Sequence, residues 1–437
     1  MAVNLDPYAE RYAVRTRGMT ASEIRALFAV ASRPDVVSLA GGMPYISALP
    51  LDAVGALVQE LVAERGATAL QYGSGQGDPR LRELICSVME LEGIAATPDD
   101  VVVTVGSQQA LDIVTRTFCD PGDVVVAEGP SYVGALGTFA SYQTEVVHVP
   151  MDEDGLVPEA LRETLARLER AGRRPKLIYT VPNYHNPAGV SLAEGRRDEI
   201  VEIAARAGVL LLEDDPYGLL GFDEEPRRAL RARETSAAGG GNVLYLGSFS
   251  KTFAPGLRVG WVLAPPEVRQ RLVLASEAAV LCPPMFNQLV VAEYLATQPW
   301  QQQVKVFRDL YRERRDATLD ALETLMPPGC RWTHPTGGFY VWLTLPPGLD
   351  SKAMAPRAIE ARVAYVPGTG FFADGTGAAH LRLSYCYPEP ARIREGIRRL
   401  AGVVEQETEL RIRYGPVTGE DHTAVTHPAD VPGPEQV

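Results

Sequence analysis

The sequence lacks the segments that would insert a protein into a membrane. Nowhere do 18 uncharged apolar residues follow one another, which excludes an ordinary transmembrane helix. The first 19 residues carry charges throughout and contain no apolar core of signal-peptide length. Basic residues are outnumbered, 42 against 55 acidic, and the net charge of −13 repels nucleic-acid phosphates and anionic lipid surfaces. We therefore expect a soluble, cytoplasmic protein that binds neither nucleic acid nor membranes.

Cysteine is scarce, and its spacing argues against a cross-linked or zinc-binding protein. The five cysteines are scattered along the chain, at Cys86, Cys119, Cys282, Cys330 and Cys386. No CxxC pair occurs, so reduced and mostly buried thiols fit better than disulfides or a zinc site. The six histidines are equally dispersed. We expect no metal.

Lysine is the rarest charged residue, with only four copies among 42 basic residues. Lys176, Lys305 and Lys352 stand beside charged or turn residues, whereas Lys251 has small and apolar neighbours in LGSFSKTFAPGLRVGW. Desolvation there would lower its pKa, as an amine that forms a Schiff base requires. A lysine at a strand end can also extend its stem along apolar surface and keep its amine in water. The surrounding motifs decide between these two interpretations.

Short β-rich runs alternate with longer amphipathic runs from about residue 97 to 265. The expected strands are VVVTV, DVVVAE, KLIYTVP, VLLLED, NVLYLGS and VGWVLA. Leu111, Val114 and Phe118 recur at helical spacing, which predicts a helix that begins just after Gly106 and buries this stripe. The alternation predicts an α/β fold whose mostly parallel sheet is covered by helices.

The chain of 437 residues is long enough for two or three domains, and its character changes after Pro299. A long charged amphipathic run is followed by the strand-like segments GGFYVWLTL and HLRLSYCY and by the helical segment PARIREGIRRLAGVVEQ. The last residues are rich in Pro, Gly, Thr and acids, which predicts disorder. We expect an N-terminal arm with part of the small domain (1–48), a large α/β domain (49–300), a small α+β domain (301–413) and a disordered tail (414–437).

The segment SFSKTFAPGLRVGW resembles the cofactor-lysine motif of fold-type I aminotransferases of class I/II. It is most similar to the subgroup that contains 2-aminoadipate and aromatic aminotransferases. The resemblance extends from about Met19 to Val403, and four further motifs stand in the family's order and spacing. It implies pyridoxal 5′-phosphate (PLP) as the cofactor, the large and small domains of fold type I, and Lys251 as the residue that holds the cofactor.

The segment GSQQAL follows an expected strand and opens an expected helix. Ser107, Gln108 and Gln109 would present backbone N–H groups and side-chain donors to an anion at the positive end of this helix. Without its neighbours, Ser107 is an ordinary N-cap residue. The resemblance implies that the anion is the cofactor phosphate.

Further residues of the expected phosphate site come from other segments. Arg258, seven residues beyond Lys251, can add a bidentate charge-assisted contact, and Ser248 and Ser250 can add hydroxyls. The family completes the site with a tyrosine from the neighbouring subunit, and Tyr72 in LQYGSGQGDPRLRE matches that place. The resemblance therefore implies a homodimer. The glycines of GSGQG follow no apolar strand and match a dinucleotide loop only weakly.

The segment VLLLEDDPYG places acidic and aromatic residues just past a buried strand, where ligands of open α/β sheets bind. The motif assigns Asp214 to the pyridine nitrogen of the cofactor, which turns the ring into an electron sink. Asp215 would point elsewhere, and in the alternative register the two residues exchange roles. Tyr217 and Asn186, the latter in VPNYHNPAG, would bond the phenolic oxygen, although NPAG is also a plain β-turn. Tyr132 matches an aromatic residue that stacks on the ring, or it serves ordinary packing.

Arg382 is expected to bind the substrate α-carboxylate. An arginine between Leu381 and Leu383 on a strand is costly unless a carboxylate meets it, and an internal salt bridge is the alternative. The segment SLAGGMP resembles the segment that approaches the same carboxylate, with Gly41 and Gly42 giving the room.

The resemblance implies transfer of the amino group of an L-amino acid to a 2-oxo acid such as 2-oxoglutarate, through an internal aldimine at Lys251. Candidate donors are 2-aminoadipate, glutamate and aromatic amino acids. The segment ASEIRALF resembles a mobile segment that supplies an arginine to the substrate side chain; Arg25 matches, and a surface helix residue is an equal interpretation. Decarboxylation, elimination or condensation on the same scaffold stays open. A regulator with an aminotransferase-like domain would carry a basic helix-turn-helix domain, whereas about 35 residues precede SLAGG.

Overall fold

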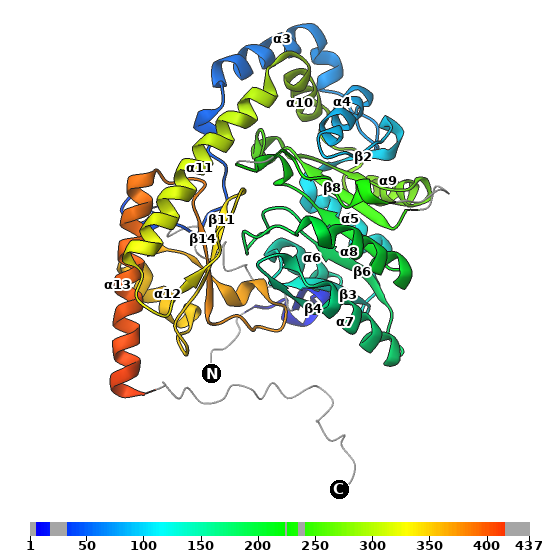
Figure 1. The fold of residues 1–437 in the computed structure, drawn as a ribbon. Coiled ribbons are helices and arrows are strands. Elements are labelled where there is room, and N and C mark those ends of the chain that lie inside the picture. Colours follow the sequence, from blue (N-terminus) through cyan, green and yellow to red (C-terminus); the bar gives the residue numbers. More distant parts are fainter. Residues whose placement is uncertain (1–5, 18–32, 223–224, 235–240, 416–437) are drawn as a thin grey trace.

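The computed structural model describes residues 6–17, 33–222, 225–234 and 241–415 (Figure 1). Arg25 and the predicted tail from residue 416 onward lie outside the described residues. Within these ranges, no helix has the length and hydropathy that a membrane crossing needs. All five cysteines are described and free, and three of them are buried, as the sequence predicts.

An eight-stranded sheet forms the centre of the larger part of the molecule, with the strand order β2-β9-β8-β7-β6-β3-β4-β5. Its strands are β2 (Val101–Val105), β3 (Val124–Gly129), β4 (Glu145–Asp152), β5 (Gly155–Leu156), β6 (Pro175–Thr180), β7 (Leu210–Asp214), β8 (Val243–Ser248) and β9 (Val259–Leu263). The strands from β8 to β4 pair in parallel, whereas β9 is antiparallel to both β2 and β8. The expected mostly parallel sheet is confirmed, and all six expected strands are present.

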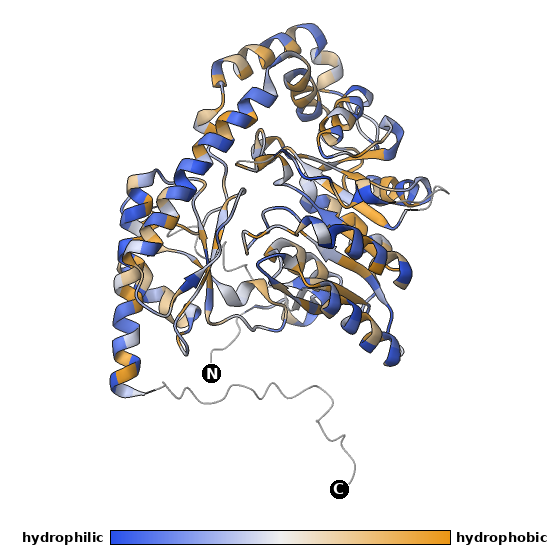
Figure 2. Ribbon diagram, in the orientation of Figure 1, coloured by the Kyte–Doolittle hydropathy of each residue, from blue (hydrophilic) through white to orange (hydrophobic). Residues whose placement is uncertain are grey.

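Helices cover both faces of this sheet, because successive side chains of a strand point to opposite sides. In β3, Val124 and Val126 pack in the core under α7 (Pro158–Arg170) and α8 (Glu194–Ala207). Val125 and Ala127 pack in the other core, with the predicted helix α5 (Gly106–Phe118). The helices turn their apolar sides to the sheet and their polar sides outward (Figure 2). Within α5, Leu111 and Val114 are fully buried and Phe118 is half-buried.

A second, four-stranded antiparallel sheet lies opposite the first, with the order β10-β11-β14-β13. The strands of this sheet are β10 (Arg331–Trp332), β11 (Tyr340–Thr344), β13 (Val366–Pro367) and β14 (His380–Ser384). The helices of the same part of the chain are α11 (Trp300–Leu325), α12 (Ser351–Glu360) and α13 (Pro390–Tyr414). The amino-terminal strand β1 (Val37–Ser38) joins this part by pairing with β12 (Val363–Ala364). The long helix α11 runs from the region of α3 (Leu51–Ala69) and α10 (Met285–Thr297) to α13 (Figure 1).

The structure differs from the sequence prediction at β4 and at the end of α13, among other elements. No strand was expected at β4, where Glu145 and His148 interrupt the apolar pattern and most residues are only partly buried. Helix α13 continues two turns beyond Gln406, because the following Glu, Leu and Arg residues favour helix.

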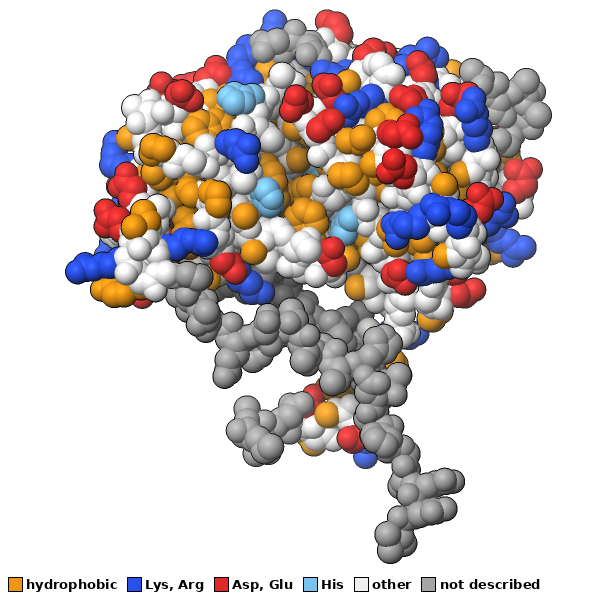
Figure 3. Space-filling view, turned by 60° about the horizontal axis from the view of Figure 1, so that its bottom comes forward, with side chains coloured by type: hydrophobic (Ala, Val, Ile, Leu, Met, Phe, Trp, Pro, Cys, Tyr) orange, Lys and Arg blue, Asp and Glu red, His pale blue; other side chains and the backbone are white. Residues whose placement is uncertain are grey.

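Acidic and basic side chains are interspersed on the face shown in Figure 3, so the net negative charge is not gathered there in one block.

Candidate active site

A cavity of about 290 Å³ lies between the carboxyl ends of the parallel strands and the smaller sheet. The carboxyl ends of such strands are where ligands of α/β sheets bind. The expected site residues that line the cavity are Gly41, Gly42, Ser107, Gln108, Tyr132, Asn186, Asp214, Tyr217, Ser248, Ser250, Lys251, Arg258 and Arg382. The structure thus brings together residues from seven separate segments of the sequence.

Lys251 follows β8 and directs its amine into the cavity. Its Nζ donates a hydrogen bond to the carbonyl oxygen of Gly42 at 3.0 Å and lies 5.6 Å from the centre of the Phe339 ring. Burial lowers the pKa of Lys251 to about 8, and the charges of Arg382 and Arg258 act in the same direction. An appreciable fraction of the amine is therefore neutral near pH 7, as a nucleophile and proton carrier requires.

Asp214 ends β7 and is buried beside the cavity. Its Oδ2 accepts a hydrogen bond from the Tyr179 hydroxyl at 2.8 Å, whereas its Oδ1 receives none from the described residues. Burial raises the pKa of Asp214 to about 7, and the Tyr179 hydrogen bond opposes that rise. A buried carboxylate oxygen without a donor is costly, so this oxygen has the capacity to accept a hydrogen bond from a ligand N–H group.

Several hydrogen-bond donors gather where the amino-terminal end of α5 meets Arg258. Gly106 has a φ of +71°, and a Cβ atom there would collide with the Arg258 guanidinium. Arg258 itself adopts a left-handed φ of 53°, and its Nη1 donates to Ser250 Oγ at 3.3 Å. Ser250 N donates to Ser248 Oγ at 3.1 Å, which holds the Ser248 hydroxyl close to Ser250. The helix end, the guanidinium and the hydroxyls are donors suited to a phosphate group.

Arg382 on β14 is 1% exposed and has no carboxylate partner among the described residues. Its Nη1 donates to Asn186 Oδ1 at 2.8 Å and its Nη2 to the Ala40 carbonyl oxygen at 2.7 Å, while Nε has no acceptor. Its guanidinium carbon lies 4.2 Å from the centre of the Tyr340 ring. The internal salt bridge that the sequence left open is therefore not formed within the described ranges, and the buried cation fits an anionic ligand.

Comparisons with known proteins agree with this geometry. The family model of "Aminotransferase class I and II" matches residues 34–400. The chain belongs to this family. Aromatic-amino-acid aminotransferase 1 of Thermococcus litoralis is 40% identical over 401 residues, which cover 92% of this chain and 95% of that protein. The 2-aminoadipate transaminase of Thermus thermophilus is 38% identical over 395 residues, which cover 90% and 96%.

A solved structure adds the cofactor to this comparison. LysN, the α-aminoadipate aminotransferase of Thermus thermophilus complexed with N-(5′-phosphopyridoxyl)-L-leucine, superposes with a TM-score of 0.85 at 35% identity. The match covers 92% of this chain and 99% of that one. The protein is therefore a PLP-dependent aminotransferase with the fold-type I architecture that its sequence predicts. The described residues fit PLP, because Asp214 Oδ1 lacks a donor, donors suited to a phosphate gather near Gly106, and Lys251 lines the same cavity.

Two of the expected residues that the structure describes, Gln109 and Tyr72, do not line the cavity in one chain. Gln109 turns away, since its Oε1 accepts from Val105 N at 2.6 Å and its Nε2 donates to Ser276 Oγ at 3.4 Å. Tyr72 is 77% exposed. Arg25 lies outside the described residues. The cofactor contacts of Gln109 and Tyr72 and the substrate contact of Arg25 stay predictions.

Tyr340 and Tyr179, which are not among the residues expected from the sequence, contact residues of the site directly. The Tyr340 hydroxyl lies 3.4 Å from the Tyr217 hydroxyl and occupies the position that a Gly42 side chain would need. A glycine is therefore required at position 42. The signal for Tyr340 was present in GGFYVWL, where period-two alternation places Tyr340 on the same face of its strand as Trp342.

Proposed function

We propose that the aminotransferase uses Lys251, Asp214 and Arg382 as the three residues on which transfer of an amino group to a 2-oxo acid depends. The observation that supports this assignment is that the three residues line one cavity and that each has a group available to bind or react with a ligand. Lys251 has a lowered pKa, Asp214 Oδ1 lacks a donor, and Arg382 is a buried cation without a carboxylate.

Each of these residues has a defined task in the proposed mechanism. The Lys251 amine would hold the cofactor covalently, and as a free amine it would take a proton from, or return one to, the substrate Cα. Asp214 keeps the pyridine nitrogen protonated, because a buried carboxylate stabilises the adjacent cation. Bound PLP supplies an electron sink for the negative charge that develops at Cα. Asn186 and Tyr217 hydrogen-bond the phenolic oxygen, and Tyr132 packs on the ring.

The remaining contacts bind the anionic groups of the cofactor and the substrate. Ser107, Gln108, Ser248, Ser250 and Arg258 hold the cofactor phosphate. Arg382 binds the substrate α-carboxylate, which fixes the Cα–H bond relative to Lys251, and the backbone at Gly42 approaches the same group.

The substrate is an L-amino acid, with 2-aminoadipate, glutamate and aromatic amino acids as candidate donors and 2-oxoglutarate as a candidate acceptor. The names of the two related enzymes support the aromatic and 2-aminoadipate candidates. An acidic donor would need a second cation for its side chain, and Arg25 is the predicted source of that charge.

A homodimer completes the proposed phosphate site, with Tyr72 reaching the cavity of the partner. Support comes from apolar side chains left in water, since Leu70 and Tyr72 are 75% and 77% exposed. Gly73 lies against Met285, and Leu274 and Leu281, which precede Met285 in the sequence, are also exposed. We also propose the domain division expected from the sequence: an arm with part of the small domain (1–48), a large domain (49–300) and a small domain (301–413). A cytoplasmic location is a further part of the proposal, and the free cysteines support it.

The assignment of Lys251 is tested by Lys251→Ala. The purified wild-type protein should absorb in the visible region and retain the cofactor after borohydride reduction, whereas the variant should lose both properties. A variant that keeps the reducible covalent cofactor contradicts the assignment. Mixing the wild type with a panel of L-amino acids then identifies the donor by formation of pyridoxamine phosphate and the matching oxo acid. Release of CO2 or of ammonia without an acceptor would instead indicate decarboxylation or elimination.

A further inference from the structure

Two buried carboxyl groups meet behind the cavity, outside the residues that contact cofactor or substrate. Glu92, just after α4 (Pro79–Glu90), and Asp215, just after β7, line the same small buried space and are 3% and 5% exposed. They meet at Gly218, where a Cβ atom would collide with both carboxyl groups. A glycine at position 218 therefore makes room for the pair.

Neighbouring residues donate a hydrogen bond to each of these two carboxyl groups, but the contact between Glu92 and Asp215 itself still needs one proton. The Tyr245 hydroxyl donates to Glu92 Oε2 at 2.7 Å, and Asn183 Nδ2 donates to Asp215 Oδ2 at 2.7 Å. Glu92 Oε1 and Asp215 Oδ1 receive no hydrogen bond from any N–H or O–H group of the described residues. Two carboxylates cannot donate to each other, whereas a carboxylic acid donates to a carboxylate in a strong charge-assisted hydrogen bond.

The surroundings determine which group carries the proton. Asp215 Oδ2 accepts a hydrogen bond from Asn183 Nδ2, and Asn183 Oδ1 accepts one from the fully buried Arg197 at 2.6 Å. The Arg197 charge and the Asn183 amide therefore stabilise the ionised form of Asp215. Glu92 faces the carboxylates of Asp215 and Glu213 and the Tyr245 hydroxyl, and no cation is hydrogen-bonded to it in the described ranges. Burial and the Asp215 charge raise the pKa of Glu92 well above its ordinary value.

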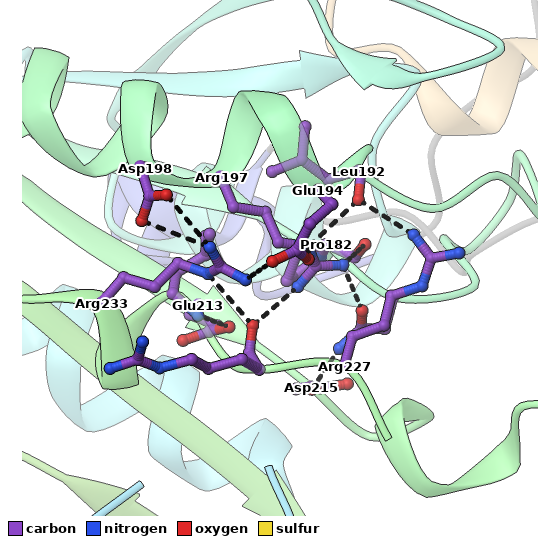
Figure 4. A network of polar contacts seen from close by, with 12 residues as sticks. Pro182, Leu192, Glu194, Arg197, Asp198, Glu213, Asp215, Arg227 and Arg233 are labelled. Atoms are coloured by element: carbon purple, nitrogen blue, oxygen red, sulfur yellow. Dashed lines mark hydrogen bonds and ion pairs between the residues drawn. The ribbon is translucent and has the colours of Figure 1, made fainter. Parts of the chain in front are cut away.

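The pair is connected to two segments that carry proposed cofactor contacts. Asp215 is the next residue after Asp214 and lies two residues before Tyr217. Asn183 lies three residues before Asn186 in the loop that follows β6. Arg197 Nη2 also donates to the Pro182 carbonyl oxygen at 3.3 Å in the same loop (Figure 4). The hydrogen bonds therefore fix the turn after β7 relative to the loop after β6.

We propose that a neutral Glu92 donates a shared proton to an ionised Asp215, and that this pair positions the turn bearing Asp214 and Tyr217 against the loop bearing Asn186. The positioning part of this inference rests on the proposed cofactor contacts of those three residues, whereas the shared proton does not. Glu92 and Asp215 are positioning residues, because they act on the cofactor through their neighbours.

Two substitutions of Glu92 separate a neutral acid from a carboxylate. Glu92→Gln replaces a neutral carboxyl with a neutral amide of the same shape, which can donate to Asp215 and accept from Tyr245. The dissociation constant of PLP and the pH at which the visible band of the holoenzyme changes should then stay close to wild type, within about twofold. Glu92→Leu removes the donor and should weaken PLP binding about tenfold, or ~1.4 kcal/mol. Glu90→Gln, at the exposed end of the same helix, is the matched charge control.

Infrared spectroscopy of the holoenzyme tests the shared proton directly. At about pH 8.5, above the pKa of about 7 to which burial raises both Glu213 and Asp214, the wild type should retain a carboxylic-acid carbonyl band. That band should be absent from Glu92→Gln and present in Glu90→Gln. An unchanged band in Glu92→Gln overturns the assignment of the proton. A Glu92→Gln protein that binds PLP as poorly as Glu92→Leu, or that fails to fold, overturns the neutral state of Glu92.

The two proposals fail separately. If Lys251→Ala kept the covalent cofactor, the proposed function would fail while the infrared band and its loss in Glu92→Gln remained. If Lys251→Ala behaved as expected and Glu92→Leu bound PLP like the wild type, with an unchanged visible band, the pair would have no positioning role.

Discussion

Tyr179 on β6 donates its hydroxyl to Asp214 Oδ2 across 2.8 Å, and both side chains are buried. This hydrogen bond is the only contact within the described residues that favours the ionised form of Asp214 directly, since burial and the Asp215 charge both raise its pKa. The strength with which the aminotransferase holds a protonated pyridine ring should therefore depend on Tyr179.

The first prediction concerns Tyr179→Phe. Loss of a hydrogen bond to a charged group costs about 1.5 to 3 kcal/mol, so the dissociation constant of PLP should rise about 10- to 100-fold. Spectrophotometric titration of the apoprotein with PLP measures this change. The matched control is Tyr142→Phe, because the Tyr142 hydroxyl donates to Asp112 at 3.0 Å outside the cavity. Equal effects of both substitutions would assign the loss to general destabilisation.

The second prediction concerns the pH dependence of cofactor attachment. The pKa of Lys251 is lowered to about 8 by burial, and only the neutral amine attacks the PLP aldehyde. The rate of covalent attachment to the apoprotein should therefore rise with pH, reach half its maximum near pH 8 and then level off. Stopped-flow absorbance over this pH range measures the rate, with Lys251→Ala as the blank. A rate that still rises near the ordinary lysine value of 10.5 would contradict the lowered pKa.

The third prediction concerns Arg382→Ala. Removing one partner of a buried charge pair costs about 3 to 5 kcal/mol, so kcat/KM for an amino acid should fall at least 100-fold. An amine that lacks the carboxylate serves as an internal control, because it makes no contact that Arg382 would supply. The wild type should strongly prefer the amino acid to the amine, and the variant should lose that preference. A preference that survives the substitution would show that another group reads the carboxylate.

The fourth prediction concerns the stability of Asp214→Asn in the apoprotein and the holoenzyme. Asp214 ionises near 3.8 when unfolded and near 7 when folded, so its contribution to stability is present below about pH 4 and is lost as the pH rises to about 7. Asparagine cannot ionise. The apo variant should therefore be more stable than apo wild type at pH 8, by on the order of 1 to 4 kcal/mol, and equally stable at pH 4.

Urea unfolding at both pH values measures this difference, with exposed Asp120→Asn as the control. The holoenzyme should behave in the opposite way, because asparagine cannot hold the pyridine nitrogen protonated. A variant that stabilised the holoenzyme would contradict the proposed contact between Asp214 and the cofactor.

The assembly of the site could be predicted largely because its residues stand at strand ends. Asp214 closes β7 and Lys251 follows β8, and the carboxyl ends of neighbouring parallel strands meet at one edge of a sheet. The order of strands in the sheet was not needed for that inference. Arg382 could be found because a buried arginine between two leucines needs an anion, whatever its neighbours are.

Other features depend on tertiary neighbours that the sequence does not reveal. Neighbouring residues of a helix point in directions about 100° apart, so Gln108 faces the cavity while Gln109 faces Ser276. The partner of Asp214 became apparent only when β6 was seen beside β7. The pairing of Glu92 with Asp215 joins residues more than 120 positions apart, and no local pattern indicates it. The expected contact of Tyr72 requires a second chain.

The antiparallel direction of β9 has one further consequence. Ser248 at the end of β8 pairs with Gly260 on β9, so Lys251 and Arg258 belong to a single hairpin connection. Connections on a protein surface usually tolerate insertions. This one does not, because both of its ends and two of its side chains are fixed. One added residue between positions 251 and 258 would turn Arg258 away from the amino-terminal end of α5, or it would shift the register of β9 against β2 and β8. The length of this hairpin therefore sets the distance between the Lys251 amine and the phosphate contacts proposed for Arg258.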